Sequence, residues 1–146
     1  MPTAVAVKPG LTIKRRINAA PARIYQAWTD PQKMMRWYAP ANAETLAAET
    51  DARVGGRFRV LMRTADGEEH DVSGVYREVV PDEKLVFTWQ WRSKPEWESL
   101  VTVTLKRDGE ATILTLVHEQ LPDEPERDGH RNGWSGALDK LAKVVA

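Results

Sequence analysis

Cysteine is absent from this chain of 146 residues. Its absence excludes disulfides, thiolate metal ligands and a cysteine nucleophile, and it suits a reducing compartment. Long apolar runs are absent too, because none approaches the roughly 20 residues that a membrane-spanning helix needs. The first ten residues lack the basic start and apolar stretch of a signal peptide. We therefore expect a cytoplasmic protein that does not enter a membrane.

An excess of charge of either sign is also lacking, since 21 lysines and arginines balance 21 aspartates and glutamates. A balanced chain has no overall field that would draw it to nucleic acid or to an anionic membrane, so neither is expected as a partner. The length suits one domain. We predict a loose tail over residues 1–10 and a single domain over residues 11–146.

Motifs for catalysis and cofactor binding are scarce. The chain has no glycine-rich phosphate loop and no dinucleotide-binding motif, and the stretch after His118 lacks the second histidine of a zinc-protease motif. The other histidines, His70 and His130, lie far away in sequence. His118 and His130 could still meet where the last predicted strand leads into the last helix. We expect neither a metal nor a cofactor.

What the sequence does contain is a change of hydrophobic period. Residues 11–17 alternate like a strand with one buried face. Helical spacing then predicts a helix over residues 21–30 and a second short helix over residues 32–37. From residue 43 to residue 120 the period is two, and short turn signals favour an antiparallel meander. The six predicted strands lie near 43–51, 56–64, 70–79, 84–92, 98–107 and 111–120.

An amphipathic helix of roughly twenty residues ends the predicted order. Trp134, Leu138 and Leu141 form an apolar stripe along one of its faces. A seven-stranded antiparallel sheet can hide its apolar face by curling around such a helix. We predict an α+β helix-grip fold, in which a curved sheet wraps a long C-terminal helix and two short helices follow the first strand.

Three glycines in the last predicted helix are unusual, because each costs roughly 0.5–1 kcal/mol relative to alanine. Gly129, Gly133 and Gly136 lie beside the apolar stripe, where small residues let a sheet or a ligand approach closely. The alternative is that the helix begins only near Asn132.

Several motifs, taken in order, resemble the START-like superfamily, also called SRPBCC or Bet v-like. Residues 20–31 resemble its first-helix motif, and further motifs are similar to the branch of the activator of heat-shock-protein-90 ATPase homologues. The resemblance covers nearly the whole chain after Gly10. These further motifs are Trp37-Tyr38-Ala39-Pro40, Gly55-Gly56-Arg57-Phe58, Gly74-Val75-Tyr76, residues 81–89, residues 99–105, residues 115–118 and Gly133-Trp134.

The resemblance implies a helix-grip fold with a cavity between the sheet and the C-terminal helix. Members of the superfamily include ligand carriers, polyketide cyclases and a eukaryotic co-chaperone of the stress response. That co-chaperone carries a further N-terminal domain, for which we expect no room in 146 residues.

Side chains that face the expected cavity form the predicted ligand site. Tryptophans at several of these positions predict a small or narrow pocket rather than one of lipid size. The predicted ligand-binding residues are Trp37, Tyr38, Phe58, Val60, Met62, Trp89, Trp91, Val101, Val103, His118, Trp134, Leu138 and Leu141.

Three functions stay open, in this order of preference. The first is non-enzymatic binding of a small apolar or aromatic molecule. The second is a cyclase-like enzyme, with His118 assisted by Tyr38 or Arg63 as proton donor; the structural alternative is a strand-end His118 bonded to a backbone carbonyl. The third is a co-chaperone-like module that binds a chaperone partner, with Trp97 as an exposed contact. A homodimer through an edge strand is compatible with all three.

Overall fold

The computed structural model describes residues 8–146, so residues 1–7 of the predicted tail lie outside the described residues. The elements follow the predicted order of one strand, two short helices, six strands and a long helix. They are β1 (Leu11–Ile17), α1 (Pro21–Thr29), α2 (Pro31–Met34), β2 (Ala43–Thr50), β3 (Arg57–Thr64), β4 (Glu69–Val80), β5 (Lys84–Trp91), β6 (Ser99–Asp108), β7 (Ala111–Glu119) and α3 (Glu124–Val145).

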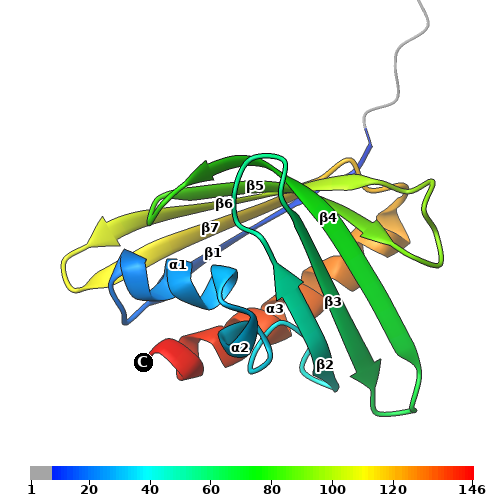
Figure 1. The fold of residues 1–146 in the computed structure, drawn as a ribbon, viewed down its shortest axis with the longest axis horizontal. Coiled ribbons are helices and arrows are strands. Elements are labelled where there is room, and N and C mark those ends of the chain that lie inside the picture. The colour runs from blue at the N-terminus through cyan, green and yellow to red at the C-terminus, as the bar shows by residue number, and fades with distance from the viewer. Residues whose placement is uncertain (1–7) are drawn as a thin grey trace, which may run out of the picture.

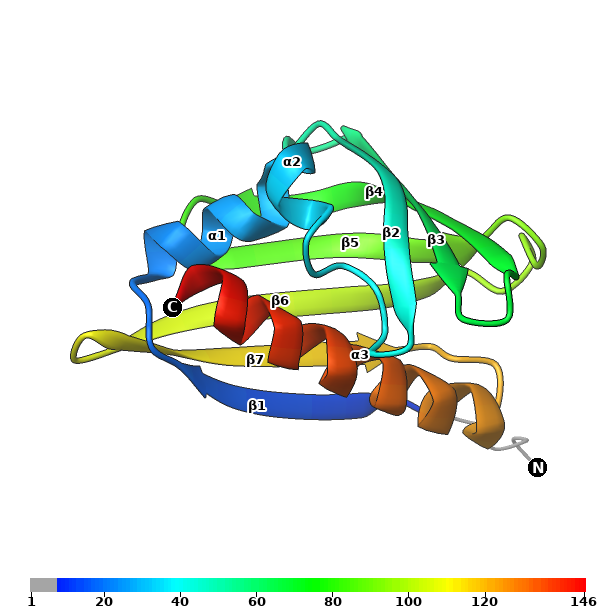
Figure 2. The same cartoon turned by 90° about the horizontal axis from the view of Figure 1, so that it is seen from below.

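The seven strands form one antiparallel sheet in the order β1-β7-β6-β5-β4-β3-β2. Strands β2 to β7 are a meander, and β1 closes the other edge beside β7, with Leu11 opposite His118. The sheet is strongly curved, and α3 crosses its concave side (Figures 1 and 2). The helix-grip fold predicted from the sequence is confirmed.

Alternation along the strands puts the apolar side chains on the concave side. In β3, Phe58, Val60 and Met62 are buried, while Arg57, Arg59 and Arg63 face solvent. In β7, Leu114 and Leu116 are fully buried in the same way. The period of two therefore assigned the inward face of these strands correctly.

In β4, apolar residues occur on both faces, so alternation alone does not assign the buried face. Its pairing with β5 shifts register between Tyr76 and Glu78. A bulge of this kind moves the side chains that follow it to the other face of the sheet. Val72 and Tyr76, before the shift, are buried, whereas Val79 beyond it is only partly buried.

α2 ends three residues earlier than predicted. The prediction was a helix over residues 32–37, but the helix ends at Met34 and the chain continues as turns. Trp37 and Tyr38 therefore lie in turns after the helix rather than in a further helical turn. Here both are buried, and Trp37 Nε1 donates to the carbonyl oxygen of Ala27 at 2.9 Å.

α3 begins at Glu124, so the alternative start near Asn132 is wrong. The Asp123 carboxylate accepts a hydrogen bond from the backbone N–H of Glu126 at 2.9 Å, which caps the first turn. Across residues 8–146, none of the helices combines the length and the apolar character needed to cross a membrane.

The apolar stripe of α3 lies in the grip of the sheet. Trp134, Leu138 and Leu141 are 4%, 1% and 0% exposed, and α1 lies beside the C-terminal part of the helix (Figure 2). Gly136 permits a close approach, because an added Cβ would lie 2.7 Å from the backbone nitrogen of Ala41. This position therefore requires glycine.

Candidate functional site

A pocket of about 400 Å³ lies between the N-terminal half of α3 and the end of β5. Small-molecule sites occupy about 300–1,000 Å³, so this pocket is a small one. Four segments that are distant in sequence supply its walls: the turn after α2, the start of β4, the end of β5 with its following loop, and α3. The lining residues are Tyr38, Ala39, Pro40, Glu68, His70, Trp89, Trp91, Ser93, Lys94, Pro125, Glu126, Gly129, His130, Gly133, Trp134 and Ala137.

Four of the predicted ligand-binding residues line this pocket, namely Tyr38, Trp89, Trp91 and Trp134. We call these four side chains the aromatic wall. The other predicted residues do not line it but are buried in the core around it, where they fill the concave side of the sheet. These core residues are Trp37, Phe58, Val60, Met62, Val101, Val103, His118, Leu138 and Leu141.

The polar rim of the pocket was not predicted. Glu68 precedes β4, Lys94 belongs to the loop after β5, and Glu126 lies in the first turn of α3. No pattern in the sequence brings these three segments together. The sequence indicates only the part of the pocket that α3 forms. Gly129 and Gly133 recur there at the four-residue spacing that places two residues on one helix face.

Gly129 and Gly133 leave space that the pocket occupies. A Cβ added at Gly129 would meet no atom within 4 Å, and one at Gly133 would meet Pro40 Cγ at 3.5 Å, an ordinary contact. Unlike Gly136, these two positions are not required to be glycine by a neighbouring backbone. Together they cost α3 about 1–2 kcal/mol relative to alanine.

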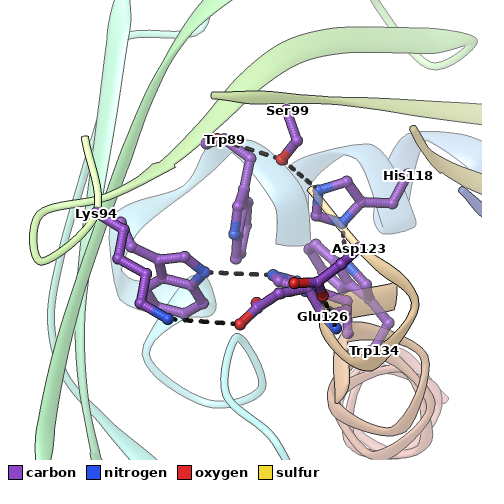
Figure 3. Close-up of polar contacts among 9 residues, drawn as sticks. Trp89, Lys94, Ser99, His118, Asp123, Glu126 and Trp134 are labelled. Atoms are coloured by element: carbon purple, nitrogen blue, oxygen red, sulfur yellow. Dashed lines mark hydrogen bonds and ion pairs between the residues drawn. The ribbon is translucent and has the colours of Figure 1, made fainter. Parts of the chain in front are cut away.

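His118 lies behind the pocket in a chain of hydrogen bonds (Figure 3). Trp134 Nε1 donates to His118 Nδ1 at 3.0 Å, and His118 Nε2 lies 2.7 Å from Ser99 Oγ. Because an indole nitrogen can only donate, His118 Nδ1 is unprotonated and its hydrogen is on Nε2. His118 therefore donates to Ser99, and Ser99 donates to the carbonyl oxygen of Trp89 at 3.3 Å.

A serine and a histidine at this distance could form a nucleophile–base pair, but the tautomer opposes it. A general base must face the serine with its unprotonated nitrogen. Here the hydrogen bond from Trp134 leaves Nδ1 unprotonated, so the nitrogen that faces Ser99, Nε2, carries the hydrogen. Arg63, the other proposed proton donor, lies on the outer face of the sheet and pairs with Glu44 at 2.6 Å. The partners of His118 are thus a serine and an indole, rather than the predicted backbone carbonyl.

His130 repeats this arrangement at the pocket wall. Trp91 Nε1 donates to His130 Nε2 at 3.3 Å, so His130 Nδ1 carries the hydrogen and donates to the carbonyl oxygen of Glu126 at 2.8 Å. The ring centroids of His118 and His130 are 4.7 Å apart, which confirms that these two histidines meet. Over residues 8–146, no cluster of three or more metal-ligating side chains forms.

Both histidines have lowered pKa values. Burial holds the pKa of His118 well below the ordinary 6.5, and the adjacent His130 lowers it further. Burial also lowers the pKa of His130, although the backbone carbonyl and the charge of Glu126 oppose this effect. The unfolded chain therefore takes up protons at a higher pH than the folded chain does, and stability is lost as the pH falls below 6.5.

The free energy of unfolding should be constant above pH 7 and then fall, by up to about 1.4 kcal/mol per pH unit for each of the two histidines. Urea denaturation between pH 8 and pH 5 measures this decline, above the range in which most carboxylates titrate. A flat profile would contradict the assignment of His118 and His130 as neutral, buried groups.

Lys140 fixes the part of the wall that carries Tyr38. Its ammonium donates to the carbonyl oxygens of Ala39, Pro40 and Ala43 at 3.1, 2.7 and 2.9 Å. A lysine has three N–H donors, so all of them are used. No sequence pattern indicates this anchor, because the lysine and its acceptors are about one hundred residues apart.

Replacing Lys140 with methionine should lower the free energy of unfolding by about 1–3 kcal/mol, because three carbonyl groups lose their common partner. Urea denaturation measures the change. Lys143→Met, at an exposed position one turn further along α3, is the matched control and should change stability by less than about 0.5 kcal/mol. Equal effects of the two substitutions would refute the anchoring role.

Trp97 is not the exposed loop-tip residue that was predicted. It is partly buried, and the Lys94 ammonium lies 4.3 Å from the centre of its ring. The same ammonium lies 3.6 Å from Glu126 Oε1. Lys94 therefore bridges the loop after β5 to the first turn of α3 at the mouth of the pocket (Figure 3).

The family model described as Activator of Hsp90 ATPase homolog 1-like protein matches residues 18–146. The chain belongs to the Activator of Hsp90 ATPase homolog 1-like family. The START-like resemblance inferred from the motifs is thereby confirmed.

Two curated relatives support this family membership. The human Activator of 90 kDa heat shock protein ATPase homolog 1 is 29% identical over 127 residues, which cover 85% of this chain and 33% of the human protein. The mouse protein of the same name is 28% identical over the same length. The chain thus spans about a third of the length of the curated relatives it matches.

Two solved structures share the fold. A protein of Chromobacterium violaceum is 28% identical with a TM-score of 0.83, over 93% of this chain and 96% of that protein. A protein of Silicibacter pomeroyi, named for the same family, is 28% identical with a TM-score of 0.81, over 92% of this chain and 96% of that protein.

Proposed function

We propose that the protein binds a small, mostly apolar or aromatic molecule in the pocket of about 400 Å³ and catalyses no reaction on it. The observation that carries the proposal is the aromatic wall opposite two helix glycines that no neighbouring backbone requires. Glycines that weaken a helix and leave ligand-sized space beside aromatic side chains are explained if the space is used.

The chemistry of the lining supports this proposal. Each 100 Å² of apolar ligand surface that the pocket removes from water contributes about 2.5 kcal/mol, before the costs of association. Both ring nitrogens of His118 are engaged within the fold, and so are both ring nitrogens of His130. Neither imidazole presents a free nitrogen to a substrate, which favours binding over catalysis.

Thermal unfolding and tryptophan fluorescence, measured with a panel of aromatic and aliphatic compounds, test the proposal. A ligand that binds only the folded chain at a hundred times its Kd should add about 2.7 kcal/mol to the free energy of unfolding. Because three tryptophans belong to the aromatic wall, the same ligand should change the fluorescence in a saturable manner. If no compound of the panel raises the stability or changes the fluorescence at millimolar concentrations, the proposal is wrong.

The human relative favours a second function, a co-chaperone-like module, because that protein is named as an activator of the 90 kDa heat shock protein ATPase. Titration of this chain into a heat-shock-protein-90 chaperone, with ATP turnover and sedimentation as measurements, tests it. The absence of both a complex and a change in turnover would remove this candidate. For either function, we propose the cytoplasm as the place of action.

A further inference from the structure

Carboxylates outnumber permanent cations at the mouth of the pocket. Glu68 and Glu126 line it, whereas Lys94 is the one lysine or arginine among the described residues that do so. Outside the lining, the start of α3 adds the carboxylates of Asp123 and Glu124 and the guanidinium of Arg127, which pairs with Asp128. At pH 8, where histidine is neutral, the mouth therefore carries a negative charge that disfavours an anionic ligand.

The start of α3 offers no free anion site either. The carboxylate of Asp123 already accepts the hydrogen bond of the Glu126 backbone N–H at 2.9 Å. This side chain occupies the position that an incoming carboxylate or phosphate would take at a helix N-terminus. An anionic ligand would have to approach through the carboxylates without that compensation.

Lys94 shows that the mouth already accommodates an ammonium group. Its Nζ lies 3.6 Å from Glu126 Oε1 and 4.3 Å from the centre of the Trp97 ring. A carboxylate and an aromatic face thus hold the same cation, at a position where the Lys94 side chain is 46% exposed. The side chain is tethered by a flexible stem and can withdraw into solvent.

The aromatic wall extends this environment into the pocket. Faces of tryptophan and tyrosine rings attract organic cations through their quadrupoles, most strongly where water is excluded. Quaternary ammonium groups are recognised in this way by cages of aromatic side chains. The wall comprises three tryptophans and a tyrosine within one pocket of about 400 Å³.

We infer that the ligand carries an organic cation, an amine or a quaternary ammonium, attached to an apolar body. The apolar body fills the pocket, and the cation lies at the mouth beside Glu126, from which it displaces Lys94. This assignment rests on the proposed function, because it specifies the ligand class of the same pocket.

Three naphthalene compounds of matched size test the charge preference: naphthylethyl trimethylammonium, naphthylethanol and naphthylpropionate. Their Kd values are measured by calorimetry at pH 8. The ammonium compound should bind about three- to thirty-fold more tightly than the alcohol, and the carboxylate should bind most weakly.

Two variants test the residues. Glu126→Gln should weaken binding of the ammonium compound about three- to tenfold and leave binding of the alcohol unchanged. Lys94→Met should tighten binding of the ammonium compound, because the competing cation is removed. Lys106→Met, at an exposed position on β6 outside the pocket, is the control and should change none of the three Kd values.

The outcomes separate this inference from the proposed function. If the alcohol binds but the ammonium compound gains nothing, or if the carboxylate binds most tightly, the cation preference is overturned and the pocket remains a ligand site. Weakened binding in Lys94→Met would identify Lys94 as an anchor for anions and would also overturn it. If none of the three compounds binds, both proposals fail.

Discussion

Replacing His118 with alanine should lower the free energy of unfolding by about 4 kcal/mol. The side chain is 0% exposed, and removing a large buried ring leaves a cavity that costs about 3–5 kcal/mol in comparable cases. The substitution also removes the acceptor of the Trp134 indole and the donor to Ser99. A buried polar group without its partner costs about 1–3 kcal/mol, so the fold depends on this imidazole.

Denaturation by urea at pH 8 measures this effect. Ser99→Ala removes a single partner from the same chain of hydrogen bonds and should cost about 1–2 kcal/mol. His70→Ala is the matched control, because His70 is only partly buried, and it should cost less than about 1 kcal/mol. A loss below 1 kcal/mol in His118→Ala would contradict the structural role assigned to this histidine.

Replacing Gly129 with leucine should strongly weaken ligand binding without loss of stability. A Cβ at Gly129 meets nothing within 4 Å, and leucine is a better helix former than glycine by about 0.8 kcal/mol. The new side chain would occupy part of the pocket of about 400 Å³. We expect the Kd of any pocket ligand to rise at least about tenfold, since overlapping atoms cannot share the space.

Two alanine variants are the controls for this prediction. Gly129→Ala should stabilise the protein by about 0.5–1 kcal/mol and keep most of the binding, because alanine adds a single carbon. Gly136→Ala should instead destabilise it by about 1–3 kcal/mol, because its Cβ would lie 2.7 Å from the Ala41 backbone nitrogen and 2.9 Å from Ala41 Cβ. Unchanged binding in Gly129→Leu would show that the ligand site is elsewhere.

Hydrophobic period and turn residues were sufficient to predict most of the fold. Every strand was expected within two residues of its observed ends, because each alternates between a buried and a solvent-exposed face. Two features depend on local structure that periodicity does not record. The bulge after Tyr76 interrupts the alternation of β4, whose face stayed undecided, and α2 ends at Met34, so Trp37 and Tyr38 reach the core from turns.

The site was less predictable. The sequence indicates to which face of the sheet a side chain points, but not whether that side chain lines the pocket or is buried in the core. Phe58 and Trp89 both point to the concave side, yet only Trp89 reaches the pocket. The bridge from Lys94 to Glu126 and the anchor at Lys140 depend on tertiary placement of charged residues that would otherwise be expected on a solvated surface. Only Gly129 and Gly133, as breaks in a helical pattern, carried a local signal.

β1 is the first of the seven strands to be synthesised, but the one strand it pairs with, β7, is the last. Leu11 meets His118 across more than one hundred residues of intervening chain. At about 5–20 residues per second, a ribosome leaves β1 without its partner for about 5–20 s. During that interval the nascent chain exposes the apolar face of Leu11, Ile13 and Ile17, and closure of the sheet must wait for a long-range encounter. Protection of this strand from protease should therefore arise only after β7 has left the ribosomal exit tunnel.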